Sequence, residues 1–245
     1  MIPVSGLSWT ILIPIKRLGE AKTRLRGALP GVNHRRLVVA MTLDTVAAAV
    51  ACPVAGRVVA VTDDVAAAEA VRALGAEVVP DLPDAGLNQA LAYAATIARP
   101  KAAPGAQPGL AALAADLPAL RTAELTEALR AAAEVAWPPS GSMPSVATLS
   151  PATPVRAYVA DASGTGTVLL AAPPGARLEP CFGRDSAAAH SASGAIALTD
   201  EWPSLRRDVD TAADLAAAVV LGLGPHTAHV VGQTSAPLAG KPRAY

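Results

Sequence analysis

The chain has 245 residues, enough for one domain with a substantial core, and its 20 lysines and arginines balance its 20 aspartates and glutamates to a formal net charge of zero. Only 3% of the residues are aromatic, so the chain offers neither a long-range positive field nor many rings on which bases could stack, and we expect no nucleic-acid partner. The two cysteines, Cys52 and Cys181, lack the spacing of metal ligands and are given no role.

The N-terminal segment is apolar, but it contains Pro3 and Pro14 and is followed, not preceded, by the basic pair Lys16 and Arg17. A secretory signal has the opposite charge order. Further along, charged residues and prolines interrupt each apolar stretch before it reaches the roughly eighteen residues of a membrane span. We therefore expect a cytoplasmic protein with no membrane partner.

Short β-branched segments alternate with longer alanine-rich amphipathic segments, which is typical of strand-helix-strand units. The expected elements, in chain order, are a strand Thr10 to Ile15, a helix Asn33 to Ala51, a strand Arg57 to Thr62, a helix from Asp63 or Asp64 to Leu74, a strand Glu77 to Val79, a helix Leu87 to Ala98, a strand Leu110 to Ala114, a helix capped by Thr122 and ending at Ala136, strands Val155 to Val159 and Thr165 to Leu170, a helix Thr211 to Leu221, and an apolar turn at His226 to Val231. This order predicts a single-domain α/β fold with a mixed, mostly parallel sheet flanked by helices.

Two segments rich in Pro, Gly and Ser interrupt this pattern, and a polar tail ends the chain. We expect one domain over residues 1–231, with variable loops at about 99–109 and 137–154, and a frayed tail at 232–245.

A basic loop follows the first predicted strand, within the stretch IPIKRLGEAKTRL that begins at Ile13. It carries Lys16, Arg17, Lys22 and Arg24. Ligands of parallel α/β sheets bind at the carboxyl ends of the strands, so a polyphosphate could lie here. The loop lacks the glycines of a P-loop or a dinucleotide-binding motif. A solvated surface loop is an equal alternative.

Three aspartates occupy positions typical of a metal site. Asp116 comes directly after a predicted strand, and alternation places Asp208 and Asp210 on one side of an extended segment. Carboxylates gathered at strand ends can hold magnesium against phosphate oxygens. In the alternative interpretation, Asp210 caps the helix that follows and Asp116 binds backbone amides of its own turn.

Glycines and hydroxyl residues gather in the stretches GTGT from Gly164 and FGRDS from Phe182, the second of which opens a small helix. Glycines allow close approach of a ligand, and hydroxyls and free amides at a helix start can bind an anion. Together the two stretches could hold a substrate with a phosphate and a carboxylate; singly, each is an ordinary turn. No acidic partner in the sequence singles out a histidine, so no role is given to His34, His190, His226 and His229.

In order and spelling, these segments resemble the guanylyltransferases of deazaflavin coenzyme (F-420) biosynthesis, a family that includes 2-phospho-L-lactate guanylyltransferase and phosphoenolpyruvate guanylyltransferase. The resemblance runs from about Trp9 to Val231. It lies in KRLGEAKTRL from Lys16, ADLPAL from Ala115, GTGT from Gly164, FGRDSAAAHSASGA from Phe182 and RDVDTAADL from Arg207. It implies a nucleotidyltransferase fold like that of molybdenum-cofactor guanylyltransferase.

The resemblance also implies the reaction and the residues that serve it. The family joins GMP from GTP to a phosphorylated three-carbon acid, here phosphoenolpyruvate, with magnesium as cofactor, and its product passes to a downstream transferase of the pathway. The implied roles are catalysis for Asp116, Asp208 and Lys22; magnesium binding for Asp116, Asp208 and Asp210; phosphoenolpyruvate binding for Thr167, Gly183 and Ser186; and nucleotide binding for Lys16, Lys22, Arg24 and Asn88. The oligomeric state is left open.

Other functions remain as alternatives. 2-Phospho-L-lactate and 3-phosphoglycerate differ from phosphoenolpyruvate by little more than a hydroxyl or an unsaturation, so either could be the acceptor. The predicted pocket of Thr167, Gly183 and Ser186 disfavours a larger acceptor such as a molybdopterin or a sugar phosphate. A module that binds GTP without turning it over is disfavoured because all three aspartates are present.

Overall fold

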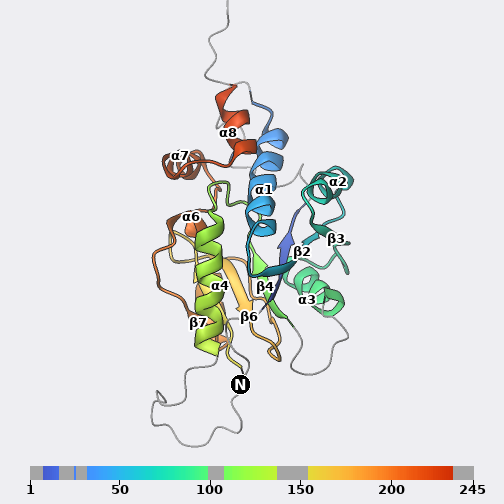
Figure 1. The fold of residues 1–245 in the computed structure, drawn as a ribbon, viewed down its shortest axis with the longest axis vertical. Helices are drawn as coiled ribbons and strands as arrows, with labels where there is room; N and C mark the ends of the chain where they lie inside the picture. Colours follow the sequence, from blue (N-terminus) through green and yellow to red (C-terminus); the bar gives the residue numbers. More distant parts are fainter. Residues whose placement is uncertain (1–7, 17–24, 26–31, 99–107, 137–153, 234–245) are drawn as a thin grey trace, which may run out of the picture.

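A computed structural model describes residues 8–16, 25, 32–98, 108–136 and 154–233 of the chain. Most of the basic loop, most of both proline-rich segments and the end of the polar tail lie outside these residues, so the predictions made for them are not addressed by the structure. The described part is shown in Figure 1.

Within the described ranges, the strands form one seven-stranded sheet in the order β3-β2-β1-β4-β6-β5-β7. Their bounds are β1 Trp9–Pro14, β2 Ala55–Val61, β3 Glu77–Val79, β4 Gly109–Leu113, β5 Ala157–Ala160, β6 Thr167–Ala172 and β7 Ile196–Ala197. β1 pairs in parallel with β2 and β4, β2 with β3, and β5 with β7, whereas β6 runs antiparallel to both β4 and β5. The prediction of a mixed, mostly parallel sheet is confirmed.

Helices cover both faces of this sheet. Their bounds are α1 His34–Val50, α2 Val65–Ala73, α3 Leu87–Ala98, α4 Thr122–Ala136, α5 Ser186–Ala192, α6 Pro203–Arg206, α7 Ala212–Leu221 and α8 Pro225–Gly232. Ile11 and Ile13 of β1 pack in one core cluster with residues of α1 and α4, which lie in front of the strands in Figure 1. Leu12 belongs to a second cluster with residues of α3 and α5. Alternate residues of the central strand therefore serve two core layers.

The structure corrects the sequence-based expectation at two helices. Thr122 is the first residue of α4 and not its cap, and its hydroxyl donates to the carbonyl oxygen of Ala48 on α1 at 3.2 Å. The expected apolar turn near the end of the chain is helix α8. The buried carboxylate of Asp44 on α1 caps it, accepting from the backbone N–H groups of His226 and Thr227 at 3.0 and 2.7 Å.

Short elements were also missed or misplaced. β6 begins at Thr167 and not at Thr165, because the N–H of Thr165 donates to Oδ1 of Asp161 in a turn. The sequence analysis did not predict α6, of four residues, or β7, of two, because both are too short to show the periodic spacing of apolar residues that indicates a helix or a strand.

No single helix of the described ranges is long and apolar enough to cross a bilayer, whereas α7 and α8 together have the length and composition for it, although they bend by 117° at the break between them.

Candidate active site

A cavity of about 700 Å³ opens where β1 and β4 end. Because β6 runs antiparallel to β4, its first residue lies at the same edge of the sheet. The lining residues are 14–16 at the end of β1 and after it, 113–116 at the end of β4 and after it, 165–167 before and at the start of β6, 182–186 before and at the start of α5, Asp161, Asp208 and Asp210, together with Val38, Met41 and Thr42 of α1 and Leu87 of α3. The cavity therefore lies at the carboxyl edge of the parallel strands, where ligands of open α/β sheets bind.

One side of the cavity carries Asp116, Asp208 and Asp210, which we call the carboxylate wall. The backbone N–H of Val209 donates to the carbonyl oxygen of Asp116 at 3.1 Å, which joins two segments far apart in the sequence. The side chain of Val209 is fully buried, while the aspartates before and after it line the cavity. The predicted alternation at this segment is therefore confirmed.

The structure decides one of the alternatives for these aspartates. The N-cap of α7 is Thr211, whose hydroxyl accepts from the N–H of Asp214, and the carboxylate of Asp214 accepts from the N–H of Thr211. This capping box occupies the position that the alternative reserved for Asp210. Asp210 is thus not the cap of α7.

The donor set of the carboxylate wall suits a hard cation. Oxygen ligands are those that Mg²⁺ prefers, and Mg²⁺ is usually held by one or two carboxylates together with substrate phosphates. Within the described ranges no three acidic, histidine or cysteine side chains lie close enough together to form a metal site by themselves. The carboxylate wall fits a metal that a bound nucleotide helps to hold.

Lys16 is the described part of the basic loop at the cavity. It is exposed and lines the cavity just after β1. β1 pairs with β4, the strand that precedes Asp116. Lys22 and Arg24 lie outside the described residues.

A second part of the cavity lining consists of Thr167, Gly183 and Ser186, which we call the donor wall. Thr167 begins β6 and Ser186 begins α5, and the two elements are joined where the N–H of Ala187 donates to the carbonyl oxygen of Thr165 at 3.1 Å. Gly183 has a φ of +137° and open space where a Cβ would lie. A side chain there would strain the backbone and reach into open space beside the cavity lining. The structure thus brings the three predicted residues to one wall.

A turn from Asp161 to Gly166 shapes the edge of the donor wall. Oδ1 of Asp161 accepts from the hydroxyl of Ser163 at 2.9 Å and from the N–H of Thr165 at 3.0 Å. A Cβ on Gly166 would collide with the carboxylate of Asp161, so the second glycine of the GTGT stretch is needed for this close approach.

His190, to which the sequence analysis gave no role, lies directly behind the donor wall. The ring is fully buried, with Nδ1 at 3.0 Å from the hydroxyl oxygen of Thr167, and Nε2 accepts from the N–H of Cys181 at 2.9 Å. The ring of Phe182 contacts it edge-on, with centroids 5.1 Å apart. Burial, and after it the charge of Arg156, lowers the pKa of His190 to about 4.

The sequence around His190 does not indicate these partners, because Thr167 and Cys181 contact the ring only when α5 packs beside β6. The usable signal was its spacing: His190 follows Ser186 by four residues, so both lie on the buried face of the same short helix.

Asn88 on α3 holds the other side of the same loop. Its side-chain N–H donates to the carbonyl oxygen of Phe182 at 2.9 Å, and its Oδ1 accepts from the N–H of Phe182 at 2.8 Å. Its neighbour Leu87 lines the cavity. The nucleotide-binding role of Asn88 stays a prediction; the structure adds that Asn88 fixes the loop that carries Gly183.

Comparison with known proteins agrees with this geometry. The family model described as "Guanylyl transferase CofC like" matches residues 9–141, more than half of the chain. A phosphoenolpyruvate guanylyltransferase of Salinispora arenicola is 54% identical over 95% of this chain and 97% of its own length. A second protein of that name, from Geodermatophilus obscurus, is 47% identical over 96% of this chain and 99% of its own length.

Solved structures show the fold alone, because their sequence identity is low. A putative nucleotide-diphospho-sugar transferase from Desulfovibrio desulfuricans is similar with a TM-score of 0.57 at 15% identity, covering 93% of this chain and 98% of that one. A nucleotidyl transferase from Methanothermobacter has a TM-score of 0.50 at 15% identity, covering 88% and 98%. The family model and the sequence relatives show that the chain is a nucleotidyltransferase and belongs to the CofC-like guanylyltransferase family.

Proposed function

We propose that the protein joins GMP from GTP to phosphoenolpyruvate, with release of pyrophosphate, as a step of F-420 biosynthesis whose product a downstream transferase consumes. The observation that carries this proposal is that the carboxylate wall and the donor wall line the same cavity. Such a cavity can hold a metal-bound triphosphate and a small anionic acid next to each other. The names of the relatives supply the identity of the two substrates.

The carboxylate wall and Lys16 would bind the triphosphate. Asp116, Asp208 and Asp210 would hold magnesium, which when bound neutralises charge on the triphosphate and on the leaving pyrophosphate. Lys16 would contact phosphate oxygens directly, and we extend this role to Lys22 and Arg24 on the strength of the sequence alone. These groups align two anions that would otherwise repel each other.

The reaction needs no general base from the protein. A phosphate oxygen of the acid attacks the α-phosphorus of GTP, a new P–O bond forms, and the bond from the α-phosphorus to the bridging oxygen breaks with that oxygen leaving on pyrophosphate. The second pKa of a phosphate monoester is about 6, so the attacking oxygen is already ionised at neutral pH. His190, buried behind the donor wall, is accordingly not required as a base.

The donor wall would bind the acid through uncharged groups: the Thr167 hydroxyl, the backbone near Gly183, and the hydroxyl or amide of Ser186. Hydrogen bonds to an ionised partner contribute roughly 1.5–3 kcal/mol each. Neutral donors hold the acid without competing with the carboxylate wall for the metal.

The test is turnover of the pure protein with GTP, magnesium and one acid at a time, followed by pyrophosphate release and product mass. We expect phosphoenolpyruvate to give the highest kcat/KM, above 2-phospho-L-lactate and 3-phosphoglycerate. A higher kcat/KM for another acid would replace the acceptor in this proposal. GTP binding without pyrophosphate release with any of the three acids would contradict the proposal as a whole.

A further inference from the structure

We propose that His190 is a positioning residue for the acceptor: its ring fixes the Thr167 hydroxyl as a hydrogen-bond donor to the bound acid. The inference rests on the proposed function, in which Thr167 belongs to the donor wall. It goes further by assigning a direction to the Thr167 hydrogen bond and a task to a histidine that does not line the cavity itself.

The first step is the tautomer of the ring. A backbone N–H can only donate, so Nε2 of His190, at 2.9 Å from the nitrogen of Cys181, must present a lone pair. A neutral imidazole carries a single N–H, which is then on Nδ1. Nδ1, at 3.0 Å from the Thr167 hydroxyl oxygen, is therefore the donor in that contact, and the Ser186 carbonyl accepts from the same N–H.

The second step concerns the hydroxyl hydrogen of Thr167. Its oxygen accepts from His190, so its own hydrogen cannot point to that nitrogen. Across the described ranges, this hydroxyl has no other hydrogen-bond partner, and Thr167 lines the cavity. The hydrogen is left for an oxygen of a ligand in the cavity. An anionic acid supplies such an oxygen, while a cation does not.

The third step is that the ring stays neutral at working pH. The groups that act on the ring are Arg156, which precedes β5 and pairs with Glu179, the Ser186 carbonyl on α5, the backbone N–H of Cys181, and the rings of Tyr158 and Phe182. Burial, and then the charge of Arg156, disfavours the protonated ring and lowers the pKa of His190, and the Ser186 carbonyl opposes this only in part. Protonation would also set an N–H at Nε2 against the N–H of Cys181.

A double-mutant cycle tests whether His190 acts through Thr167. His190→Phe keeps an aromatic ring against Phe182 but removes both ring nitrogens, and Thr167→Val removes the hydroxyl at nearly constant shape. We expect His190→Phe to raise the KM for phosphoenolpyruvate by roughly tenfold, with the KM for GTP and kcat within about twofold. In the Thr167→Val background, the same change should raise it by less than about threefold. Additive effects would show that His190 only supports the fold.

Two further substitutions separate the two ring nitrogens. His190→Asn can place an N–H near the position of Nδ1, and His190→Gln can place a carbonyl oxygen near that of Nε2. Relative to His190→Phe, we expect His190→Asn to bring the KM for phosphoenolpyruvate most of the way back to the wild-type value and His190→Gln to change it little. The reverse order would assign the effect to the Cys181 contact and overturn the role assigned to Thr167.

Two measurements need no turnover. Long-range proton-nitrogen correlation NMR on the wild-type protein should show the neutral ring protonated on Nδ1 at pH 7, and a proton on Nε2 would overturn the inference. The double-mutant cycle can also be run on the dissociation constant of phosphoenolpyruvate by calorimetry. If the two substitutions are coupled in phosphoenolpyruvate binding but the protein shows no turnover, the proposed reaction is wrong and the role of His190 stands. If their effects on binding are additive and turnover is normal, the role of His190 is wrong and the proposed reaction stands.

Discussion

The two walls of the cavity are built in different ways. The carboxylate wall carries charged side chains on loops after β4 and before α7. A backbone hydrogen bond from Val209 to Asp116 joins these two loops, and the N–H of Leu117 donates to the hydroxyl of Thr45 on α1. The donor wall carries neutral groups at the first residues of β6 and α5 and in the loop before α5. It is held by the buried ring of His190 and by the partly buried side chain of Asn88. The difference therefore lies in charge: the carboxylate wall offers anionic groups suited to a metal and its nucleotide, whereas the donor wall offers neutral groups suited to an anionic acid.

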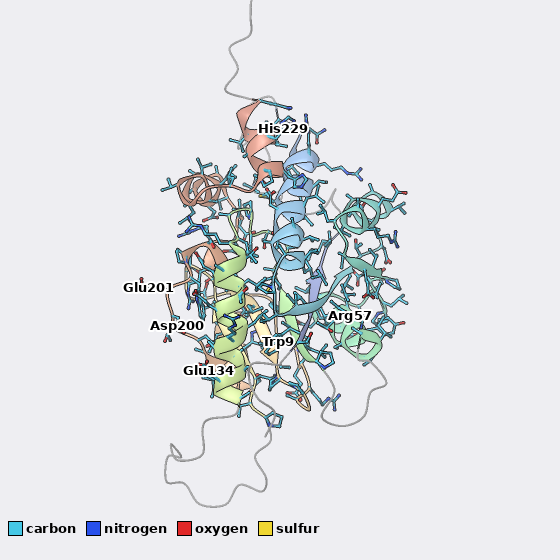
Figure 2. The ribbon with its side chains drawn as sticks, viewed as in Figure 1. Trp9, Arg57, Glu134, Asp200, Glu201 and His229 are labelled. Carbon is cyan, nitrogen blue, oxygen red and sulfur yellow. The ribbon has the colours of Figure 1, made fainter. Side chains whose placement is uncertain are left out.

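The largest effect should follow from neutralising the carboxylate wall. Asp116→Asn and Asp208→Asn should each lower kcat/KM by about a thousandfold, a barrier increase of about 4 kcal/mol, with little change in Tm because the volume is conserved. Asp200→Asn is a matched control, since this exposed residue is not part of the cavity lining and lies at the edge of the molecule in Figure 2. Retention of a tenth of the activity in either cavity variant would remove metal binding as its essential role.

The neutrality of the donor wall predicts a dependence of stability on pH. The pKa of His190 is lowered from 6.5 to about 4 in the folded protein. Above pH 6.5 the ring is neutral in both states; as the pH falls toward 4, the unfolded chain binds a proton that the folded one does not, and the free energy of unfolding decreases by about 3 kcal/mol.

Urea unfolding of the wild type and of His190→Asn at pH 7 and pH 4 isolates this contribution, because the remaining titrating groups are shared. The wild type should lose more stability than the variant. Equal losses would mean that the ring is protonated in the folded state.

Removal of a single donor should have an intermediate effect confined to one substrate. Ser186→Ala and Thr167→Ala should raise the KM for phosphoenolpyruvate ten- to a hundredfold, about 1.4–2.7 kcal/mol, and Gly183→Val should be worse because it adds backbone strain. Ser163→Ala, in the neighbouring turn, is a control for general loss of order. If thermal stability drops while the KM for the acid stays at the wild-type value, the three residues only shape turns.

The smallest effect is expected at Lys16. Lys16→Ala should weaken GTP binding about fivefold, near 1 kcal/mol, because the exposed ammonium acts on the triphosphate through solvent-screened attraction. Calorimetric dissociation constants at low and high salt are the measurement, and the exposed Arg72→Ala on α2 is the control. An unchanged dissociation constant for GTP would show that the loop at Lys16 is a solvated surface loop without a role in binding.

The two walls were also unequally predictable from the sequence. The carboxylate wall could be predicted in part. Asp116 follows β4 at the carboxyl edge of the parallel strands, as expected. Asp208 was expected at a strand end but lies between α6 and α7, and only its alternation with buried Val209 indicated that it faces the cavity. The same local signals gave the bounds of α1 and α3 to within a residue or two. The residues of the donor wall came from the family resemblance, and the structure places them together.

The contacts that hold the donor wall could not be predicted, because the partners lie far apart in the sequence. Asn88 contacts Phe182 across 94 residues, and His190 contacts Thr167 across 23. Asp44 caps α8 across more than 180 residues, which is why that helix looked like a turn. Such side-chain to backbone contacts have no sequence period and follow only from the packed fold.

The separation of the two walls is tested most directly by a two-substrate kinetic matrix on the wild type, Lys16→Ala, Ser186→Ala and the double variant. Lys16→Ala should raise the KM for GTP and leave that for phosphoenolpyruvate within about twofold, and Ser186→Ala should do the reverse. The double variant should show both increases unchanged. If either single substitution raises both Michaelis constants to the same extent, the two walls do not serve separate substrates and this account is wrong.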